Sequence, residues 1–266
     1  MEPSKCKGDW ALVTGASSGI GEEFCCQLAA AGMNILMIAR RGPVLESLSE
    51  KLKDQYGVRT LVLPLDLSER ASAVKVKEFT TRQNVKIRLL INNAAYGPWG
   101  SFDKTSAEVY EQMIQLIAST PVSLCHLFQS DLLSFPDSAV INLSSPAALQ
   151  PVPYKAVYSA VKSCLHNFSL ALYGEWQERG ILVQTLLPGP TATELDTKGG
   201  AYKSELGEMR RPASEIVDAS LSALSKDLPF VTTNKGTYKQ RVFAGVAPVK
   251  MIIREVKRMF AAPPGR

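Results

Sequence analysis

Seven short apolar runs alternate with longer amphipathic stretches along the chain. The runs lie at residues 11–13, 34–39, 60–65, 87–91, 139–143, 182–187 and 230–231, and the amphipathic stretches at about 19–31, 43–56, 68–82, 104–134, 155–178 and 212–226. Most of the short runs are apolar throughout, which is typical of strands that are covered on both faces. The longer stretches repeat apolar residues at helical spacing, which predicts helices between the strands.

This alternation predicts an α/β fold: a Rossmann-like, doubly wound parallel sheet of about seven strands with helices on both faces. The chain contains no internal repeat and no low-complexity linker. We therefore expect residues 1–266 to form a single domain, which is common for an α/β chain of this length.

Two segments depart from the alternation. Residues 193–211 are polar and contain Gly199-Gly200, which fits either a substrate lid or a solvated surface insertion. Residues 249–260 predict a basic amphipathic helix, in which Ile252, Ile253, Val256 and Phe260 share an apolar face. Such a helix is expected to pack on its own domain or on a sister subunit; attachment to a membrane surface is the alternative.

Composition narrows the function classes. Hydrophobic residues make up 45% and charged residues 21% of the chain, as in ordinary globular domains, and a net charge of +5 does not by itself indicate nucleic acid. Five cysteines without a C-x-x-C pair fit reduced thiols, and two histidines exclude a metal site built from several histidines, so we expect no metal. Neither a signal core nor a run of 18 apolar residues occurs, so we expect a cytoplasmic protein.

A glycine-rich turn follows the first predicted strand and opens the first helix. It reads Thr14-Gly15-Ala16-Ser17-Ser18-Gly19-Ile20-Gly21. Glycines there let the backbone approach a pyrophosphate, and the helix N-terminus offers N–H groups and a positive dipole end. The spacing differs from G-x-G-x-x-G, and any tight strand-to-helix connection favours glycine. The position of the turn nevertheless predicts a dinucleotide site.

The end of the second strand indicates which dinucleotide binds. Arg40 and Arg41 stand there, where a residue that binds a ribose 2′-hydroxyl would be Asp or Glu. A guanidinium suits a 2′-phosphate, and Ser17 can add a hydroxyl. We therefore predict NADP(H) rather than NAD(H); the alternative is a solvated arginine pair.

Two further strand ends carry polar or small residues. Asp66-Leu67 follows the third strand, where Asp66 either accepts from an adenine amino group or caps a helix that begins near Ser68. Asn93-Ala94 follows the fourth strand and would let a flat ring lie against the sheet edge. Asn92 is expected to be structural and to bond backbone at the strand end.

Five motifs in a fixed order give a resemblance that covers nearly the whole chain. They are Thr14-Gly15-x-x-x-Gly19-x-Gly21, Asn92-Asn93-Ala94, Ser145 placed thirteen residues before Tyr158, Tyr158-x-x-x-Lys162, and Pro188-Gly189 followed by Thr193. With these motifs the chain resembles the single-domain short-chain dehydrogenases/reductases. The resemblance implies an oxidoreductase that moves a hydride between NADP(H) and a carbonyl or alcohol, with Ser145, Tyr158 and Lys162 as catalytic residues.

The residue chemistry agrees with this expectation. Tyr158 and Lys162 lie four residues apart on a predicted helix and therefore on one face. A free phenol has a pKa of about 10, and an opposite charge within about 4–6 Å lowers such a pKa by about 1–3 units. Lys162 can supply this charge. With a lowered pKa, Tyr158 can give a proton to a carbonyl oxygen or take one from an alcohol.

Ser145 follows the fifth strand and is expected to hold the substrate oxygen, while its neighbour Ser144 bonds backbone. The resemblance gives Lys162 a second role, in which it bonds the nicotinamide ribose. It also assigns the loop after the sixth strand to the carboxamide and pyrophosphate of the cofactor, through Pro188, Gly189, Thr191 and Thr193.

One position departs from the family pattern. Ile117 stands where the family commonly carries an Asn that positions a water between the lysine and solvent, and an isoleucine side chain cannot hydrogen-bond water. Proton resupply to Tyr158 then requires direct access of water to Lys162 or substitution by Ser119, or turnover is slow. A shifted helix register is a further alternative.

The loops after strands four to six indicate an apolar carbonyl or alcohol substrate. Their aromatic and apolar residues are Tyr96, Pro98, Trp99, Phe102, Leu149, Pro151 and Tyr154. The alternative is that these residues pack against the lid or a sister chain. The resemblance implies a homo-oligomer, a dimer or tetramer. The competing interpretation is a regulatory or scaffold protein that binds NADP(H) with weak or no turnover, which Ile117 favours. The length of the chain disfavours a sugar-nucleotide epimerase.

Overall fold

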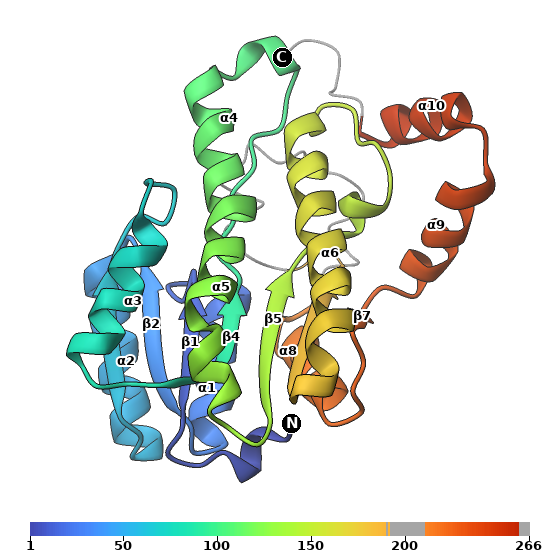
Figure 1. The fold of residues 1–266 in the computed structure, drawn as a ribbon. Coiled ribbons are helices and arrows are strands. Elements are labelled where there is room, and N and C mark those ends of the chain that lie inside the picture. Colours follow the sequence, from blue (N-terminus) through green and yellow to red (C-terminus); the bar gives the residue numbers. More distant parts are fainter. Residues whose placement is uncertain (190, 192–210, 261–266) are drawn as a thin grey trace.

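The computed structural model describes residues 1–189, 191 and 211–260, and it confirms the predicted fold class (Figure 1). Seven parallel strands pair in the order β3-β2-β1-β4-β5-β6-β7. They are β1 (Trp10–Thr14), β2 (Asn34–Ala39), β3 (Thr60–Pro64), β4 (Ile87–Asn92), β5 (Ser138–Leu143), β6 (Ile181–Leu187) and β7 (Phe230–Thr232). The order reverses between β1 and β4, and open α/β sheets bind ligands beyond the strand ends at such a switch point.

Helices cover both faces of this sheet. They are α1 (Gly19–Ala30), α2 (Gly42–Tyr56), α3 (Ser72–Arg82), α4 (Ala107–Ile114), α5 (Thr120–Leu133), α6 (Ala156–Trp176), α8 (Ala213–Leu224), α9 (Lys235–Val246) and α10 (Val249–Phe260). Helices α1, α2 and α8 form one core with the sheet, and α3, α5 and α6 form the other. In β1, Val13 faces the first core and Leu12 the second, which is why apolar residues occupy successive positions of the central strands.

Two predicted helices have different bounds in the structure, and one helix was not predicted. The stretch 104–134 forms two helices, α4 and α5, that are joined by a π-helical turn at Gln115–Ser119. Helix α3 begins at Ser72 instead of near residue 68, because Ala71 adopts a left-handed conformation with φ of 59° directly before it. Helix α9 is absent from the sequence prediction because its residues form no stripe towards the core: among its described side chains, Thr237 alone is buried.

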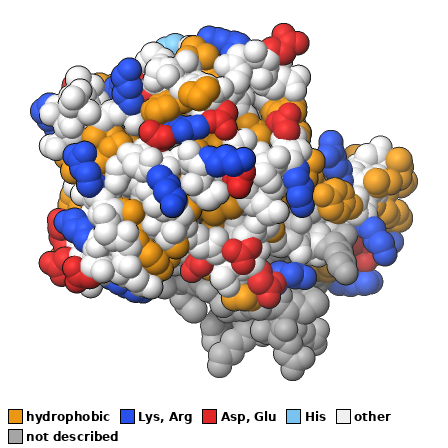
Figure 2. All heavy atoms as spheres, turned by 90° about the horizontal axis from the view of Figure 1, so that it is seen from below, with side chains coloured by type: hydrophobic (Ala, Val, Ile, Leu, Met, Phe, Trp, Pro, Cys, Tyr) orange, Lys and Arg blue, Asp and Glu red, His pale blue; other side chains and the backbone are white. Residues whose placement is uncertain are grey.

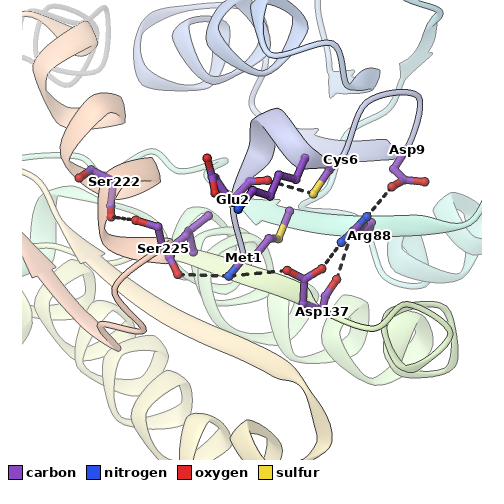
Figure 3. Close-up of polar contacts among 10 residues, drawn as sticks. Met1, Glu2, Cys6, Asp9, Arg88, Asp137, Ser222 and Ser225 are labelled. Atoms are coloured by element: carbon purple, nitrogen blue, oxygen red, sulfur yellow. Dashed lines mark hydrogen bonds and ion pairs between the residues drawn. The ribbon is translucent and has the colours of Figure 1, made fainter.

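A cluster of charges holds the amino ends of the strands together (Figure 3). Arg88 of β4 donates to the carboxylate of Asp9 at 2.7 Å, and it pairs with the carboxylate of Asp137 and donates to its carbonyl at 2.9 Å. The Met1 ammonium lies 3.9 Å from Asp137. The cluster stabilises the edge of the sheet opposite to the candidate site, which lies at the carboxyl ends.

Candidate active site

The glycine-rich turn leaves no room for a side chain at Gly15 or Gly21. Gly15 and Gly19 have φ values of +67° and +61°, which favour glycine. A Cβ on Gly15 would lie 2.7 Å from Nδ2 of Asn93, and a Cβ on Gly21 would overlap the Gly15 carbonyl oxygen. The side chain of Ile20 is buried in the core, so this residue faces the site through its backbone.

The start of α1 is suited to an anion. Ser18 occupies the N-cap position without a side-chain hydrogen bond to the first turn. The N–H groups of that turn therefore have no cap from Ser18, and together with the helix dipole they favour a negatively charged ligand.

Asn93 and Ala94 tie the end of β4 to this turn. Asn93 Nδ2 donates to the carbonyl of Thr14 at 2.9 Å, and the backbone N–H groups of Asn93 and Ala94 donate to Thr14 Oγ1 at 2.9 and 3.1 Å. The structure thus places both predicted residues beside the glycine turn.

Arg40 and Arg41 have different environments. Arg41 donates from Nε and Nη2 to Oγ of Ser17 at 3.2 and 3.1 Å, and from Nη2 to the carbonyl of Ser17 at 2.9 Å. The side chain of Arg40 is 72% exposed and lies 3.8 Å from the Asp66 carboxylate. Of the two arginines predicted at the 2′-phosphate site, Arg41 is therefore the one that lies against Ser17.

Asp66 serves the turn that follows β3. Its Oδ1 accepts from the backbone N–H and the hydroxyl of Ser68 at 2.9 and 2.6 Å. Of the two predicted roles of Asp66, these bonds favour the cap, although Asp66 caps a local turn at Ser68 and not the start of a helix. Leu67 is buried, and its carbonyl accepts a hydrogen bond from the Thr120 hydroxyl at 2.9 Å. This bond connects the segment after β3 to the start of α5.

Asn92 is buried and structural, but it does not bond backbone as expected. Its Nδ2 donates to Oδ1 of Asn142 on β5 at 2.8 Å, and Asn142 donates to Oγ of Ser169 on α6 at 2.9 Å. These two hydrogen bonds connect β4, β5 and α6 below the candidate site. Asn142 and Ser169 were not among the residues predicted from the sequence.

Two hydrogen bonds fix α6 against the end of β5. Lys162 Nζ donates to the carbonyl of Leu143 at 2.6 Å, and the Ser144 hydroxyl donates to the carbonyl of Lys162 at 2.9 Å. Ser144 therefore bonds backbone, as expected. Ser145 is the next residue, and its Oγ accepts from the N–H of Ala147 at 3.2 Å. Burial lowers the pKa of Lys162 to about 7.

The ring of Tyr158 lies near two lysines and against the backbone of Gly97. Lys162 Nζ is 5.7 Å from the centre of the Tyr158 ring, so the structure brings the predicted pair together. Lys155 Nζ lies 5.3 Å from the same ring and 5.1 Å from the ring of Trp99. A Cβ on Gly97 would lie 2.6 Å from Cδ2 of Tyr158, so a glycine is needed for the ring to lie there.

The sequence analysis did not identify Lys155 and Gly97 as site residues. Lys155 stands three residues before Tyr158, and this spacing places two helical residues on one side of a helix. The spacing alone could therefore have predicted Lys155 near Tyr158. The role of Gly97 depends on the approach of α6 to the loop after β4, which no local pattern shows.

A small cavity lies beside Tyr158. Three of the predicted pocket residues line it, namely Pro98, Phe102 and Tyr154, together with Tyr110, Met113 and Lys155. The rings of Phe102 and Tyr110 stack with centres 5.1 Å apart. Of the remaining predicted residues, Tyr96 donates to the carbonyl of Val109 at 3.0 Å, and Leu149 and Pro151 do not line this cavity.

The loop after β6 is held by the segment after β7. Gly189 N donates to Oγ1 of Thr233 at 3.3 Å, and the Thr191 hydroxyl donates to the carbonyl of Gly189 at 2.8 Å. Thr191 also forms a parallel bridge with Arg211. Thr193 and residues 194–210 of the predicted lid lie outside the described residues.

Ile117 lies in the π-helical turn and is fully buried. It packs with Met113, Val161 and Leu165, whereas Ser119 in the same turn is exposed. Exposure of Ser119 argues against its substitution for the family's Asn. The π-helical turn replaces the regular register that the sequence analysis assumed, and such turns are frequent at functional sites.

The burial of Ile117 gives a stability prediction. Ile117→Asn places an amide among apolar side chains, so it is expected to lower the free energy of unfolding by roughly 2–4 kcal/mol. Urea denaturation measures this, with Ile114→Asn as the control because Ile114 is 43% exposed. Equal stabilities of the two variants would contradict the interpretation of Ile117 as a core residue.

The family follows from a match over most of the chain. Residues 9–203 match the model of the short chain dehydrogenases. The chain belongs to this family of oxidoreductases. The match includes the glycine turn, Ser145, Tyr158 and Lys162. In the part of the chain that the structure describes, no helix is both long and apolar enough to span a membrane.

Several characterised proteins are similar to this short-chain dehydrogenase. The 7beta-hydroxysteroid dehydrogenase of Collinsella aerofaciens is 28% identical over 84% of this chain and 86% of its own length. Hydroxysteroid dehydrogenase-like protein 1 of Gallus gallus is 32% identical, and the human very-long-chain 3-oxoacyl-CoA reductase is 30% identical, each over 71% of this chain. The match spans 57% and 61% of those two proteins.

The similar solved structures are also short-chain dehydrogenases. A short-chain dehydrogenase from Sphingobium yanoikuyae in complex with NADPH has a TM-score of 0.80 at 26% identity, over 97% of this chain and 98% of the other. A 7beta-hydroxysteroid dehydrogenase structure has a TM-score of 0.84 at 25% identity, over 96% of this chain and 99% of the other.

Proposed function

We propose that this short-chain dehydrogenase transfers a hydride between NADP(H) and an apolar carbonyl or alcohol, with Tyr158 as general acid and base. One observation carries the proposal: the buried amino group of Lys162, fixed to the end of β5, lies 5.7 Å from the Tyr158 ring. A positive charge at this distance favours the phenolate form of Tyr158 and so supports proton exchange at its hydroxyl.

The residues of the switch point fit a dinucleotide with a 2′-phosphate. Gly15 and Gly21 admit no side chain because Asn93 and the Gly15 carbonyl lie against them, so the turn packs tightly before α1. The uncapped N–H groups at the start of α1 suit a pyrophosphate. Arg41 and Ser17 would hold the 2′-phosphate through charged hydrogen bonds. NADPH is bound in the similar Sphingobium yanoikuyae enzyme. The bound cofactor supplies or accepts the hydride.

The chain's own residues manage the proton. In reduction, the Tyr158 hydroxyl gives its proton to the carbonyl oxygen; in oxidation, the phenolate takes the proton from the alcohol. The Ser145 hydroxyl bonds the same substrate oxygen and stabilises charge there. Lys162 in its protonated form, and Lys155 at 5.3 Å from the ring, favour the phenolate form electrostatically.

The cavity supports an apolar substrate. Pro98, Phe102 and Met113 offer apolar surface beside Tyr158. The names of two similar proteins, a hydroxysteroid dehydrogenase and a very-long-chain 3-oxoacyl-CoA reductase, also refer to substrates with a large apolar part, a steroid and a very long acyl chain. A homo-oligomer, a cytoplasmic location and a substrate lid at 193–211 stay predictions.

The decisive experiment follows NADPH absorbance with a panel of ketones and aldehydes that includes steroid ketones and 3-oxoacyl thioesters. Consumption of NADPH with apolar carbonyls and weaker consumption with small polar ones is expected. If NADPH binds, as measured by its fluorescence, while no carbonyl consumes it, the enzymatic proposal is overturned. The regulatory alternative, which Ile117 favours, would then be supported.

The cofactor preference makes a specific prediction. Arg41→Ala removes the side chain that meets Ser17 and is expected to weaken NADPH binding about tenfold to a hundredfold, with little change for NADH. Arg40→Ala is the matched control and should have the smaller effect, because Arg40 is exposed and pairs with Asp66. Calorimetric titration of both cofactors tests this; equal losses of NADPH and NADH affinity would contradict it.

A further inference from the structure

The positive charge of the chain is concentrated in its last two described helices. Residues 235–260 contain seven lysines and arginines and one glutamate, a net charge of +6, whereas the whole chain carries +5. The remainder of the chain therefore carries −1. The charge belongs to α9 and α10, which project from the side of the domain next to β7 (Figure 1).

Apolar side chains are exposed on the same two helices. Tyr238, Val242 and Val246 follow one another at four-residue spacing on α9 and are 54%, 67% and 78% exposed. Val249 and Met259 of α10 are 62% and 63% exposed. We call these five residues the C-terminal patch. Figure 2 shows the projection at the right, where hydrophobic and basic side chains lie together.

The patch is attached to a fixed support. Ile252 and Val256 of α10 are 3% and 2% exposed and pack on Val152. Gln240 of α9 donates from Nε2 to the carbonyl of Pro146 at 2.9 Å. Packing on the domain, as the sequence analysis expected, therefore accounts for the inner side of α10 and leaves the patch at the surface.

Basic residues flank the patch. Lys239 and Arg241 lie between its residues on α9, and Lys250 follows Val249 on α10; all three are exposed. The one acidic residue, Glu255, lies 3.0 Å from Arg258 and 3.9 Å from Arg254. The patch thus combines apolar side chains with an excess of positive charge, and its complement is an apolar surface that carries negative charge.

We infer that the C-terminal patch binds the surface of an anionic lipid membrane. Helices with this composition lie in the interface, with apolar side chains among the acyl chains and lysines and arginines at the acidic headgroups. A two-fold contact between copies of the chain would instead bring two positive clusters together, which is unfavourable. Charge therefore favours the membrane over a second copy.

The attachment has a consequence for the substrate. Val152, on which α10 packs, stands two residues before Tyr154, which lines the cavity beside Tyr158. If the proposed function holds, a membrane-bound patch brings the cavity close to a source of apolar substrate.

Vesicle flotation of the full chain tests the inference without any use of turnover. We expect binding to phosphatidylcholine vesicles that contain phosphatidylglycerol, at least tenfold weaker binding to phosphatidylcholine alone, and loss of binding at high salt. Lys239→Glu/Lys250→Glu and Val242→Ser/Val246→Ser are each expected to weaken binding at least about tenfold.

Matched controls separate the patch from general surface effects. Lys51→Glu/Lys53→Glu changes the net charge equally on α2, and Val74→Ser/Leu133→Ser removes apolar residues that are 45% and 39% exposed elsewhere. Both should keep wild-type binding. Circular dichroism and NADPH affinity of each variant verify the fold.

Three results would overturn the inference: no binding to anionic vesicles, equal binding to neutral and anionic vesicles, or unchanged binding by both patch variants. Sedimentation velocity adds a fourth. If the wild type is an oligomer that does not bind vesicles, and the patch variants are monomers, the patch is an interface between copies of the chain instead.

Discussion

Tyr158→Phe is expected to lower kcat by about a thousandfold while the protein remains folded and still binds NADPH. The substitution removes the hydroxyl that exchanges the proton and keeps the ring that packs on Gly97. General acid–base catalysis by one positioned group typically contributes 10²–10⁴-fold, which sets the size of this loss. Steady-state NADPH consumption measures it, with thermal unfolding as the test of folding.

Tyr154→Phe is the matched control, because Tyr154 lines the same cavity and also loses only a hydroxyl. Its kcat should stay within about tenfold of the wild type. If Tyr158→Phe retained wild-type turnover, or if both variants lost activity equally, the assignment of Tyr158 as the proton donor would be wrong.

Lys162→Met is expected to lower kcat by roughly 10²–10³-fold and, in the same protein, to raise stability. The loss follows from removal of the positive charge near Tyr158. The gain follows from the burial of Lys162, which lowers its pKa to about 7 from the ordinary lysine value of 10.5. Holding a charged ammonium in this position costs free energy in the folded state.

The pH dependence distinguishes this cause from a general packing effect. Between pH 7 and 10.5 the unfolded chain binds more protons at this lysine than the folded chain does, so the free energy of unfolding of the wild type rises with pH. Lys162→Met should therefore be stabilised most below pH 7, by roughly 2–4 kcal/mol, and the difference should shrink towards pH 10.5.

Urea denaturation of wild type and variant across this pH range measures the difference. Lys53→Met, which replaces an exposed lysine on α2, should change stability by no more than about 0.5 kcal/mol at any pH. A Lys162→Met variant that is less stable than the wild type below pH 7 would show that the hydrogen bond to Leu143 outweighs the burial of the charge.

Local patterns predicted most of the fold and the core of the candidate site. The central strands are buried on both faces, and continuous apolar runs located all seven strands within one residue at each end. Tyr158 and Lys162 share a helix, and their spacing alone placed them on one face. Ser17 and Arg41, which were assigned to one 2′-phosphate site, lie together because they follow the neighbouring strands β1 and β2.

The remaining features depend on contacts between distant segments. Arg40 and Arg41 are equivalent in the sequence, and the path of the chain at the end of β2 decides that Arg41 meets Ser17. The pairing of Asn92 with Asn142 depends on strand order. Helix α9 carries its apolar residues on the outside, which inverts the rule that located the other helices.

The strand order has a consequence for synthesis of the chain. Strand β1 lies between β2 and β4, so one of its edges has no partner until residues 87–92 have left the ribosome. A strand edge of this kind can pair with other chains. Until β4 is made, the nascent chain therefore exposes this edge to aggregation, and a dinucleotide cannot protect it because half of the binding crevice is still missing.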